Sequence, residues 1–176
     1  ALIAIADLIY VAYSKVDVAV AGKFFTVAEV GLYGVAIQLA TMLMSKSIPL
    51  FKTVAFPAFA RMEAGSEESN GYLVTSLKFA TTMIFPVFIG VALVAEELIS
   101  LVLGSKWTEI SLVFSILVVS VPFRIVAYVI TPALLAAGGA RLDMVNALIT
   151  LIFLTGSIFL LLPLGFEGVA LAWSLT

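Results

Sequence analysis

The sequence predicts an all-α protein, a polytopic bundle of about six transmembrane helices. Three observations predict this class. First, 63% of the 176 residues are hydrophobic and 11% are charged, whereas soluble domains carry about 25% charged residues. Second, apolar stretches long enough to cross about 30 Å of hydrocarbon recur along the chain. Third, the polar residues inside these stretches recur at the spacings of one helix face.

The composition also excludes several classes of function. The chain contains no cysteine and no histidine, so it lacks a thiol nucleophile, a disulfide framework and the commonest metal ligand and proton shuttle. We therefore expect no enzyme activity, no metal and no cofactor. The formal net charge of -2 argues against nucleic acid as a partner, because neutralising phosphates requires a basic surface.

The first predicted span, residues 1–21, carries the charged side chains of Asp7, Lys15 and Asp17. Each costs about 2.5 to 3.5 kcal/mol at the centre of a membrane helix. The two aspartates share one helix face, so protein or a hydrated cavity can shelter them. They are candidate sites for a coupling Na+ or H+ ion. The alternative is that they form ion pairs with Lys15 or with Arg124 of another helix.

The second predicted span, residues 28–62, is apolar for longer than one crossing requires. As a single helix, the stretch from Glu29 to Arg61 would be roughly 50 Å long. One stripe of this helix is small and polar, which indicates that it faces protein or water. The stripe consists of Gly34, Gln38, Thr41, Ser45 and Lys52.

The second span also provides candidate binding residues. Lys52 continues the polar stripe towards a cavity, and the alternative is that its side chain extends to the lipid phosphates. Lys46 lies off the stripe, so we expect its side chain to extend to the lipid phosphates. Gln38 either hydrogen-bonds between helices or contacts a substrate. The pair Gly31 and Gly34 favours close helix packing and does not indicate a phosphate loop.

A polar loop over residues 63–71 is expected outside the membrane, and the third predicted span is 72–95. The apolar part of the next segment is too short to cross. Residues 96–109 are therefore interpreted as an interfacial segment, with Lys106 and Trp107 at the depth of the lipid headgroups.

The remaining predicted spans are 110–136, 142–162 and 168–176. The last of these stops within an apolar run and is interpreted as truncated. Because no polar linker divides the helices, residues 1–176 are expected to form a single transmembrane bundle cut from a longer membrane protein.

Arg124 is the sharpest candidate site residue. It lies roughly 20 Å from the nearer end of its span, too deep for its side chain to reach the membrane surface easily. It either faces a lumen or forms an ion pair with Asp7 or Asp17.

The distribution of lysine and arginine orients the bundle, because positive residues favour the cytoplasmic side. The residues near the two sets of loops are Arg61, Arg141, Lys52 and Lys78 on one side, and Lys23 and Lys106 on the other. Loops 63–71 and 137–141 are therefore placed in the cytoplasm.

Four segments carry a resemblance to a known family. They are DVAVAGKFFTVAEVGLYGVAIQLA (17–40), FPAFARM (56–62), AEELISLVLGSKW (95–107) and LLAAGGARLDM (134–144). In order and spacing they resemble the polysaccharide-exporter flippases of the multidrug/oligosaccharidyl-lipid/polysaccharide exporter superfamily. The resemblance covers nearly all of the chain.

The resemblance implies a transporter of two similar halves around a cavity that opens alternately to the two membrane faces. This chain would begin the second half, and a missing N-terminal half would complete the cavity. The implied cargo is an undecaprenyl-pyrophosphate-linked oligosaccharide, flipped across the bacterial inner (cytoplasmic) membrane. The implied substrate-binding residues are Arg124, Lys52, Gln38 and Lys46, since buried cations attract a pyrophosphate. Lys15 stands where the family often has a neutral polar residue.

Other functions compete with this one. An ion-coupled drug or metabolite antiporter of the same superfamily would use Asp7 or Asp17. From different classes come a membrane enzyme that acts on the lipid-linked glycan, and a non-transporting scaffold whose polar stripes serve helix packing. The enzyme is disfavoured because histidine and cysteine are absent and the longest clear loop is residues 63–71.

Overall fold

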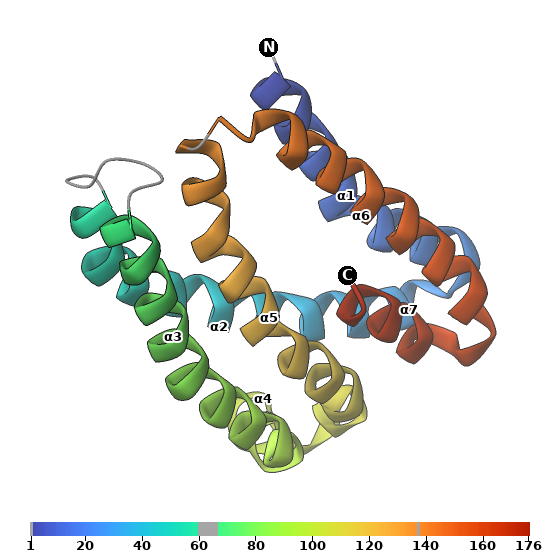
Figure 1. The fold of residues 1–176 in the computed structure, drawn as a ribbon. Coiled ribbons are helices and arrows are strands. Elements are labelled where there is room, and N and C mark those ends of the chain that lie inside the picture. The colour runs from blue at the N-terminus through green and yellow to red at the C-terminus, as the bar shows by residue number, and fades with distance from the viewer. Residues whose placement is uncertain (1, 60–66, 137) are drawn as a thin grey trace.

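The fold of the protein was examined in a computed structural model, which describes residues 2–59, 67–136 and 138–176 (Figure 1). The described residues form α-helices and short 3-10 turns, so the predicted all-α class is confirmed. The helices are α1 (Leu2–Phe24), α2 (Val27–Phe59), α3 (Glu67–Leu93), α4 (Ala95–Leu103), α5 (Ser111–Ala136), α6 (Ala140–Leu161) and α7 (Gly165–Ser174), with 3-10 helices at Ser105–Ile110 and Leu162–Leu164.

Two predicted boundaries need correction. α3 already begins at Glu67, so the second part of the predicted loop 63–71 is helical, and the first part lies outside the described residues. The predicted interfacial segment 96–109 is divided at Gly104, whose φ of 93° is a conformation that glycine adopts without steric cost. Trp107 packs against the hydrophobic core, while Lys106 is exposed.

Length and composition identify three candidate membrane spans among the described residues, or four if a bent pair counts as one span. They are Val27–Pro49, Ser105–Tyr128 and Ala140–Ser174, and the bent pair is Thr81–Leu93 with Ala95–Leu103, which meet at 71°. α1 is 23 residues long but lies outside this set. Its charged residues, among them Lys15 and Asp17, raise the cost of placing it against lipid.

The helices pack in two groups that α7 connects. α1 packs along α6, while α2 and α3 pack on α5, and α7 lies against both α5 and α6. In Figure 1, α1 and α2 run behind α6 and α5. Because lipid tails are as apolar as the helices themselves, close side-chain contact between helices, and not the hydrophobic effect, holds such a bundle together.

The main core cluster lies around α5. Its largest buried side chains include Phe114, Leu117 and Ile125 from α5. None of the buried members described for this cluster comes from α1, which contributes the partly buried Tyr13, Val16 and Val20. α1 therefore packs chiefly on α6 and reaches the main core with partly buried side chains.

A capping box begins α2. The backbone N–H and the hydroxyl of Thr26 donate to Glu29 Oε2 at 2.8 and 2.7 Å, and the backbone N–H of Glu29 donates to Thr26 Oγ1 at 3.3 Å. These bonds satisfy donors that a helix N-terminus leaves unpaired. They fix the short connection through which α1 turns into α2.

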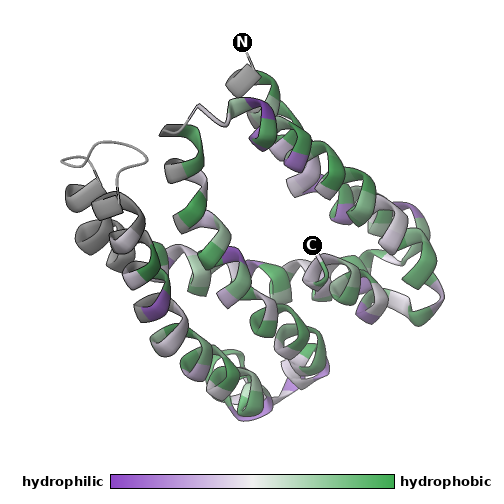
Figure 2. Ribbon diagram, in the orientation of Figure 1, coloured by the Kyte–Doolittle hydropathy of each residue, from purple (hydrophilic) through white to green (hydrophobic). Residues whose placement is uncertain are grey.

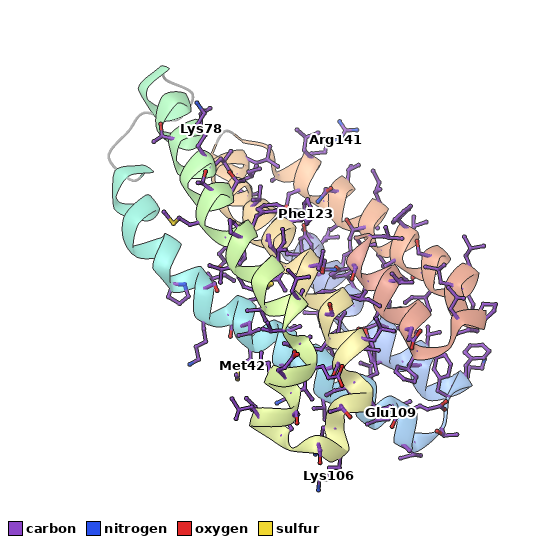
Figure 3. All side chains as sticks on the ribbon, turned by 90° about the horizontal axis from the view of Figure 1, so that it is seen from below. Met42, Lys78, Lys106, Glu109, Phe123 and Arg141 are labelled. Carbon is purple, nitrogen blue, oxygen red and sulfur yellow. The ribbon has the colours of Figure 1, made fainter. Side chains whose placement is uncertain are left out.

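The charged ends of the helices mark the two ends of the bundle. Lys78 and Arg141 lie towards one end, and Lys106 and Glu109 lie towards the opposite end (Figure 3). Figure 2 shows hydrophobic residues along most of the helix surfaces, with hydrophilic residues near the ends and at isolated turns. This distribution is typical of helices whose middle sections lie in hydrocarbon.

The turn between α6 and α7 yields a stability prediction. A Cβ at Gly168 would lie 2.0 Å from the backbone oxygen of Leu161, whereas a Cβ at Gly156 would meet nothing within 4 Å. We expect Gly168→Ala to destabilise the protein by about 1–3 kcal/mol through overpacking. Gly156→Ala should be neutral or slightly stabilising. Thermal unfolding of the purified protein in detergent measures the difference, and equal melting temperatures for the two variants would contradict this packing.

Candidate functional site

The inward face of α1 carries three polar side chains at helical spacing. Tyr10, Tyr13 and Asp17 recur at intervals of three and four, so they project from one side of the helix. The hydroxyl of Tyr10 donates to Asp143 of α6 at 3.4 Å, and the rings of Tyr10 and Tyr13 meet edge to face at 6.5 Å. This face therefore joins α1 to its neighbours through polar contacts.

Arg124 of α5 is partly buried at the point where α1, α5 and α7 meet. Its Nη1 donates to the hydroxyl of Tyr13, and its Nη2 donates to the backbone carbonyl of Trp173 and to Thr176 Oγ1, the last at 3.3 Å. The guanidinium also lies 3.5 Å from the centroid of the Trp173 ring, a cation–π geometry. Its Nε is buried without a hydrogen-bond partner among the described residues.

Asp17 is buried beside this cluster, with 1% of its surface exposed. Its Oδ2 accepts a hydrogen bond from the hydroxyl of Tyr33 of α2 at 2.8 Å, and its Oδ1 accepts one from the backbone N–H of Val18. Asp17 thus connects α1 to α2 as Tyr13 connects α1 to α5.

In the structure the hydrogen-bond partners of Arg124 are hydroxyl groups and a carbonyl group. The described residues show no ion pair between Arg124 and Asp17, and the two alternatives considered from the sequence stay predictions. The side chains of Asp7 and Lys52, the other predicted members, lie outside the described residues.

Lys15 occupies the opposite face of α1. Because it is two residues from both Tyr13 and Asp17, it projects about 200° away from each of them. It is exposed and has no hydrogen bond or ion pair with the described residues. Its neighbours on this outward face are the exposed Val11 and Val18. Lys15 is therefore a cation in mid-helix that points away from this bundle.

α2 also turns a polar face outward. Its buried face consists of Tyr33 and the small side chains of Ala36 and Ala40. The exposed residues between positions 31 and 46 are Gly31, Gln38, Met42, Ser45 and Lys46. The side chains of Gln38 and Lys46 have no hydrogen-bond partner among the described residues. Of the predicted polar stripe, Gln38 and Ser45 are exposed, Gly34 and Thr41 are partly buried, and the side chain of Lys52 lies outside the described residues.

The glycine pair on this stripe does not pack as the sequence predicts. A Cβ at Gly31 or Gly34 would meet nothing within 4 Å. The helix surface there is open towards the outside of the bundle, so the close helix approach expected of this pair is not made by the described residues.

The outward faces of the other long helices are mainly apolar, although α3 also exposes Lys78 and α6 exposes Asn146. The large exposed hydrophobic residues include Met83, Val87 and Ile89 of α3, Leu112, Val119 and Phe123 of α5, and Ile149, Ile152, Phe153 and Leu160 of α6. Such surfaces suit lipid, whereas a mid-helix lysine does not. The outward faces of α1 and α2 carry Lys15, Gln38 and Lys46 among exposed apolar residues, and together we call these two faces the α1–α2 face.

Sequence reasoning missed most of the partners in this site. Tyr13 follows the same helical spacing as Asp17 and was recognisable from that signal. Tyr33, Trp173 and Asp143 gave no comparable signal, because single aromatic or acidic residues at helix ends are common in membrane proteins. No group of three or more metal-ligating side chains is found in the described part of the chain.

These features define the chain as an α-helical multi-pass membrane protein with polar surfaces on two helices. A family model described as "Polysaccharide biosynthesis protein" matches residues 2–112, which is more than half of the chain. The chain belongs to this family. The matched region includes Lys15, Asp17 and Gln38 but ends before Arg124.

Curated relatives agree with this family. The chain is 28% identical over 172 residues to the probable low-salt glycan biosynthesis flippase Agl15 of Haloferax volcanii, covering 93% of this chain and 35% of that protein. It is 27% identical over 129 residues to the teichuronic acid biosynthesis protein TuaB of Bacillus subtilis, covering 73% of this chain and 27% of TuaB. It is 31% identical over 113 residues to the lipopolysaccharide biosynthesis protein WzxC of Escherichia coli, covering 64% of this chain and 23% of WzxC.

The chain therefore spans about a quarter to a third of the length of these relatives. No solved structure matches it.

The bond between Tyr33 and Asp17 yields a second prediction. Tyr33→Phe removes the hydroxyl that donates to a buried carboxylate, and leaving such a group underpaired costs about 1–3 kcal/mol. Ser14→Ala is the control, because that exposed hydroxyl bonds to its own helix at Val11 and its loss should change stability by less than about 0.5 kcal/mol. Thermal unfolding in detergent separates the two, and a Tyr33→Phe variant as stable as Ser14→Ala would show that the bond is not formed.

Proposed function

We propose that the chain is part of a transporter that moves a lipid-linked oligosaccharide across a membrane. The observation that carries this proposal is the α1–α2 face, on which Lys15, Gln38 and Lys46 point away from the rest of the bundle. Each lysine would be costly against lipid. A hydrated path that carries an anion is the setting in which both cations are stabilised.

The chemistry of this face suits an amphipathic anionic cargo. Lysine ammonium groups attract a pyrophosphate as point charges, and the Gln38 amide can both donate to and accept from sugar hydroxyl groups. Exposed apolar residues such as Val11 and Met42 lie on the same face, where they suit the lipid chain. We propose an undecaprenyl-pyrophosphate-linked glycan as the cargo.

In this proposal the chain is the start of the second half of a two-lobed exporter, in a bacterial inner membrane. The relatives extend well beyond the matched region, and the rest of the transporter would supply the wall that faces α1 and α2. Lys78 and Arg141 would lie at the cytoplasmic end, since positively charged residues favour that side. The similarity to Agl15, a probable low-salt glycan biosynthesis flippase, supports transport in preference to catalysis.

A second candidate function is an ion-coupled antiporter, and the burial of Asp17 favours it. A buried carboxylate that is paired with a tyrosine hydroxyl can exchange a proton or a cation and so alter the relative stability of two conformations. The coupling ion would be H+ or Na+. In this case transport would depend on Asp17 and would not depend on the lysines.

Replacing the two outward lysines tests the first proposal. In the complete transporter, Lys15→Gln with Lys46→Gln should reduce glycan export by about tenfold or more per lysine, because each charge-assisted contact contributes about 1.5–3 kcal/mol. Lys106→Gln is the matched control, because that exposed lysine lies at the end of the bundle (Figure 3). Export is measured in cells that lack the native exporter, with protein abundance checked by immunoblot.

Unchanged export in the double lysine variant would contradict the flippase proposal. The antiporter alternative predicts that this variant keeps its activity, and that Asp17→Asn removes the dependence of transport on a Na+ or H+ gradient. Measuring both variants in the same proteoliposomes therefore discriminates between the two functions.

A further inference from the structure

Tyr13 and Asp17, which both form hydrogen bonds with other helices, flank Lys15 in the sequence. Tyr13 accepts a hydrogen bond from Arg124 of α5, and Asp17 accepts one from Tyr33 of α2. Because Lys15 is two residues from each, fixing both neighbours on the inward side directs Lys15 outward. The rotational setting of α1 about its own axis therefore determines where the lysine points.

Apolar packing holds α1 mainly on one side. α1 packs along α6, and its small residues Ala6 and Ala21 are buried, but none of the buried members described for the main core around α5 comes from α1. The hydrogen bonds from α1 to α2 and α5 are made by polar side chains. Because hydrogen bonds have defined donor and acceptor geometry, these two bonds set the rotation of α1 relative to α2 and α5.

We propose that Arg124 is a positioning residue, which holds α1 in the rotation that presents Lys15 on the α1–α2 face. This inference rests on the proposed function. It assigns Arg124 a place outside the substrate path, in contrast to the contact role considered from the sequence. Arg124 acts through Tyr13, and Tyr33 makes the equivalent contact through Asp17.

The shape of the guanidinium explains why an arginine suits this position. One nitrogen donates to Tyr13 of α1 while the other donates to the backbone of Trp173 of α7, and the plane of the group lies against the Trp173 ring. A single fork thus joins α5 to two other helices. Lysine carries the same charge but has neither the fork nor the planar surface, so it cannot reproduce this geometry.

Distances between spin labels in the complete transporter test the proposal. Labels are placed by Val11→Cys on the outward face of α1 and Leu101→Cys on α4, both of which are exposed, in a background without other cysteines. This pair leaves Lys15 intact. A second pair, Ile130→Cys with Leu101→Cys, reports on α5 and α4 and serves as the reference. The distances are measured by double electron–electron resonance in detergent.

The expected result is specific to the first pair. Arg124→Gln, Arg124→Lys and Tyr13→Phe should broaden the Val11–Leu101 distribution and shift it by up to about 5 Å, because side chains lie about 5 Å from the helix axis. The Ile130–Leu101 distribution should not change. Arg141→Gln is the matched control, because that arginine is exposed at the start of α6 (Figure 3). It should leave both distributions unchanged.

Several outcomes would overturn the proposal. An unchanged Val11–Leu101 distribution in Tyr13→Phe and Arg124→Gln would show that Arg124 does not set the rotation of α1. Recovery of the native distribution in Arg124→Lys would show that charge suffices without the fork. Tyr13→Phe removes one oxygen atom, so it decides the question even if Arg124→Gln does not fold.

Failure of the proposed function would be recognised separately. If Lys15 carries no substrate, Lys15→Gln leaves export unchanged while the distance measurement still shows whether Arg124 positions α1. If Arg124 contacts substrate directly, export falls in Arg124→Lys with no change in the Val11–Leu101 distances.

Discussion

An ionised side chain in the hydrocarbon of a membrane requires polar surroundings, and the arrangement of this bundle follows from that requirement. Asp17 and Arg124 meet it inside the protein, where hydroxyl groups, a backbone carbonyl and the Trp173 ring surround them. Lys15 does not meet it inside the described residues, because it projects outward. The charges of the bundle thus fall into an inward set with partners and an outward set that needs water, other protein or an anionic ligand.

α1 belongs to both sets. Its inward face makes hydrogen bonds with α2, α5 and α6, and its outward face carries a lysine among small and apolar residues. α1 packs along α6 and contacts α2 and α5 through hydrogen bonds. The polar residues that make α1 costly to place against lipid are thus the same residues that fix its position among its neighbours.

Sequence reasoning predicted the helices and failed at their partners, for physical reasons. Long apolar stretches and small-residue breaks mark helices locally, so the class and most boundaries were recoverable. A helical wheel shows which residues share a face, but it does not show which face points into the bundle. The sequence therefore showed the polar stripe through Gln38 but not the side of the bundle that it faces. It likewise showed Lys15 in mid-helix but not that this side chain is exposed. The partners of Arg124 lie on other helices far along the chain, and no local pattern encodes such contacts.

The central claim is that the α1–α2 face borders water while the faces of α5 and α6 border lipid. Reaction of single cysteines with a membrane-impermeant thiol reagent, in the complete transporter in its membrane, tests this most directly. The account predicts labelling of Lys15→Cys and Gln38→Cys, and no labelling of Ile149→Cys or Ile152→Cys, which lie on the apolar face of α6. Equal protection of all four positions, or labelling confined to α6, would contradict it.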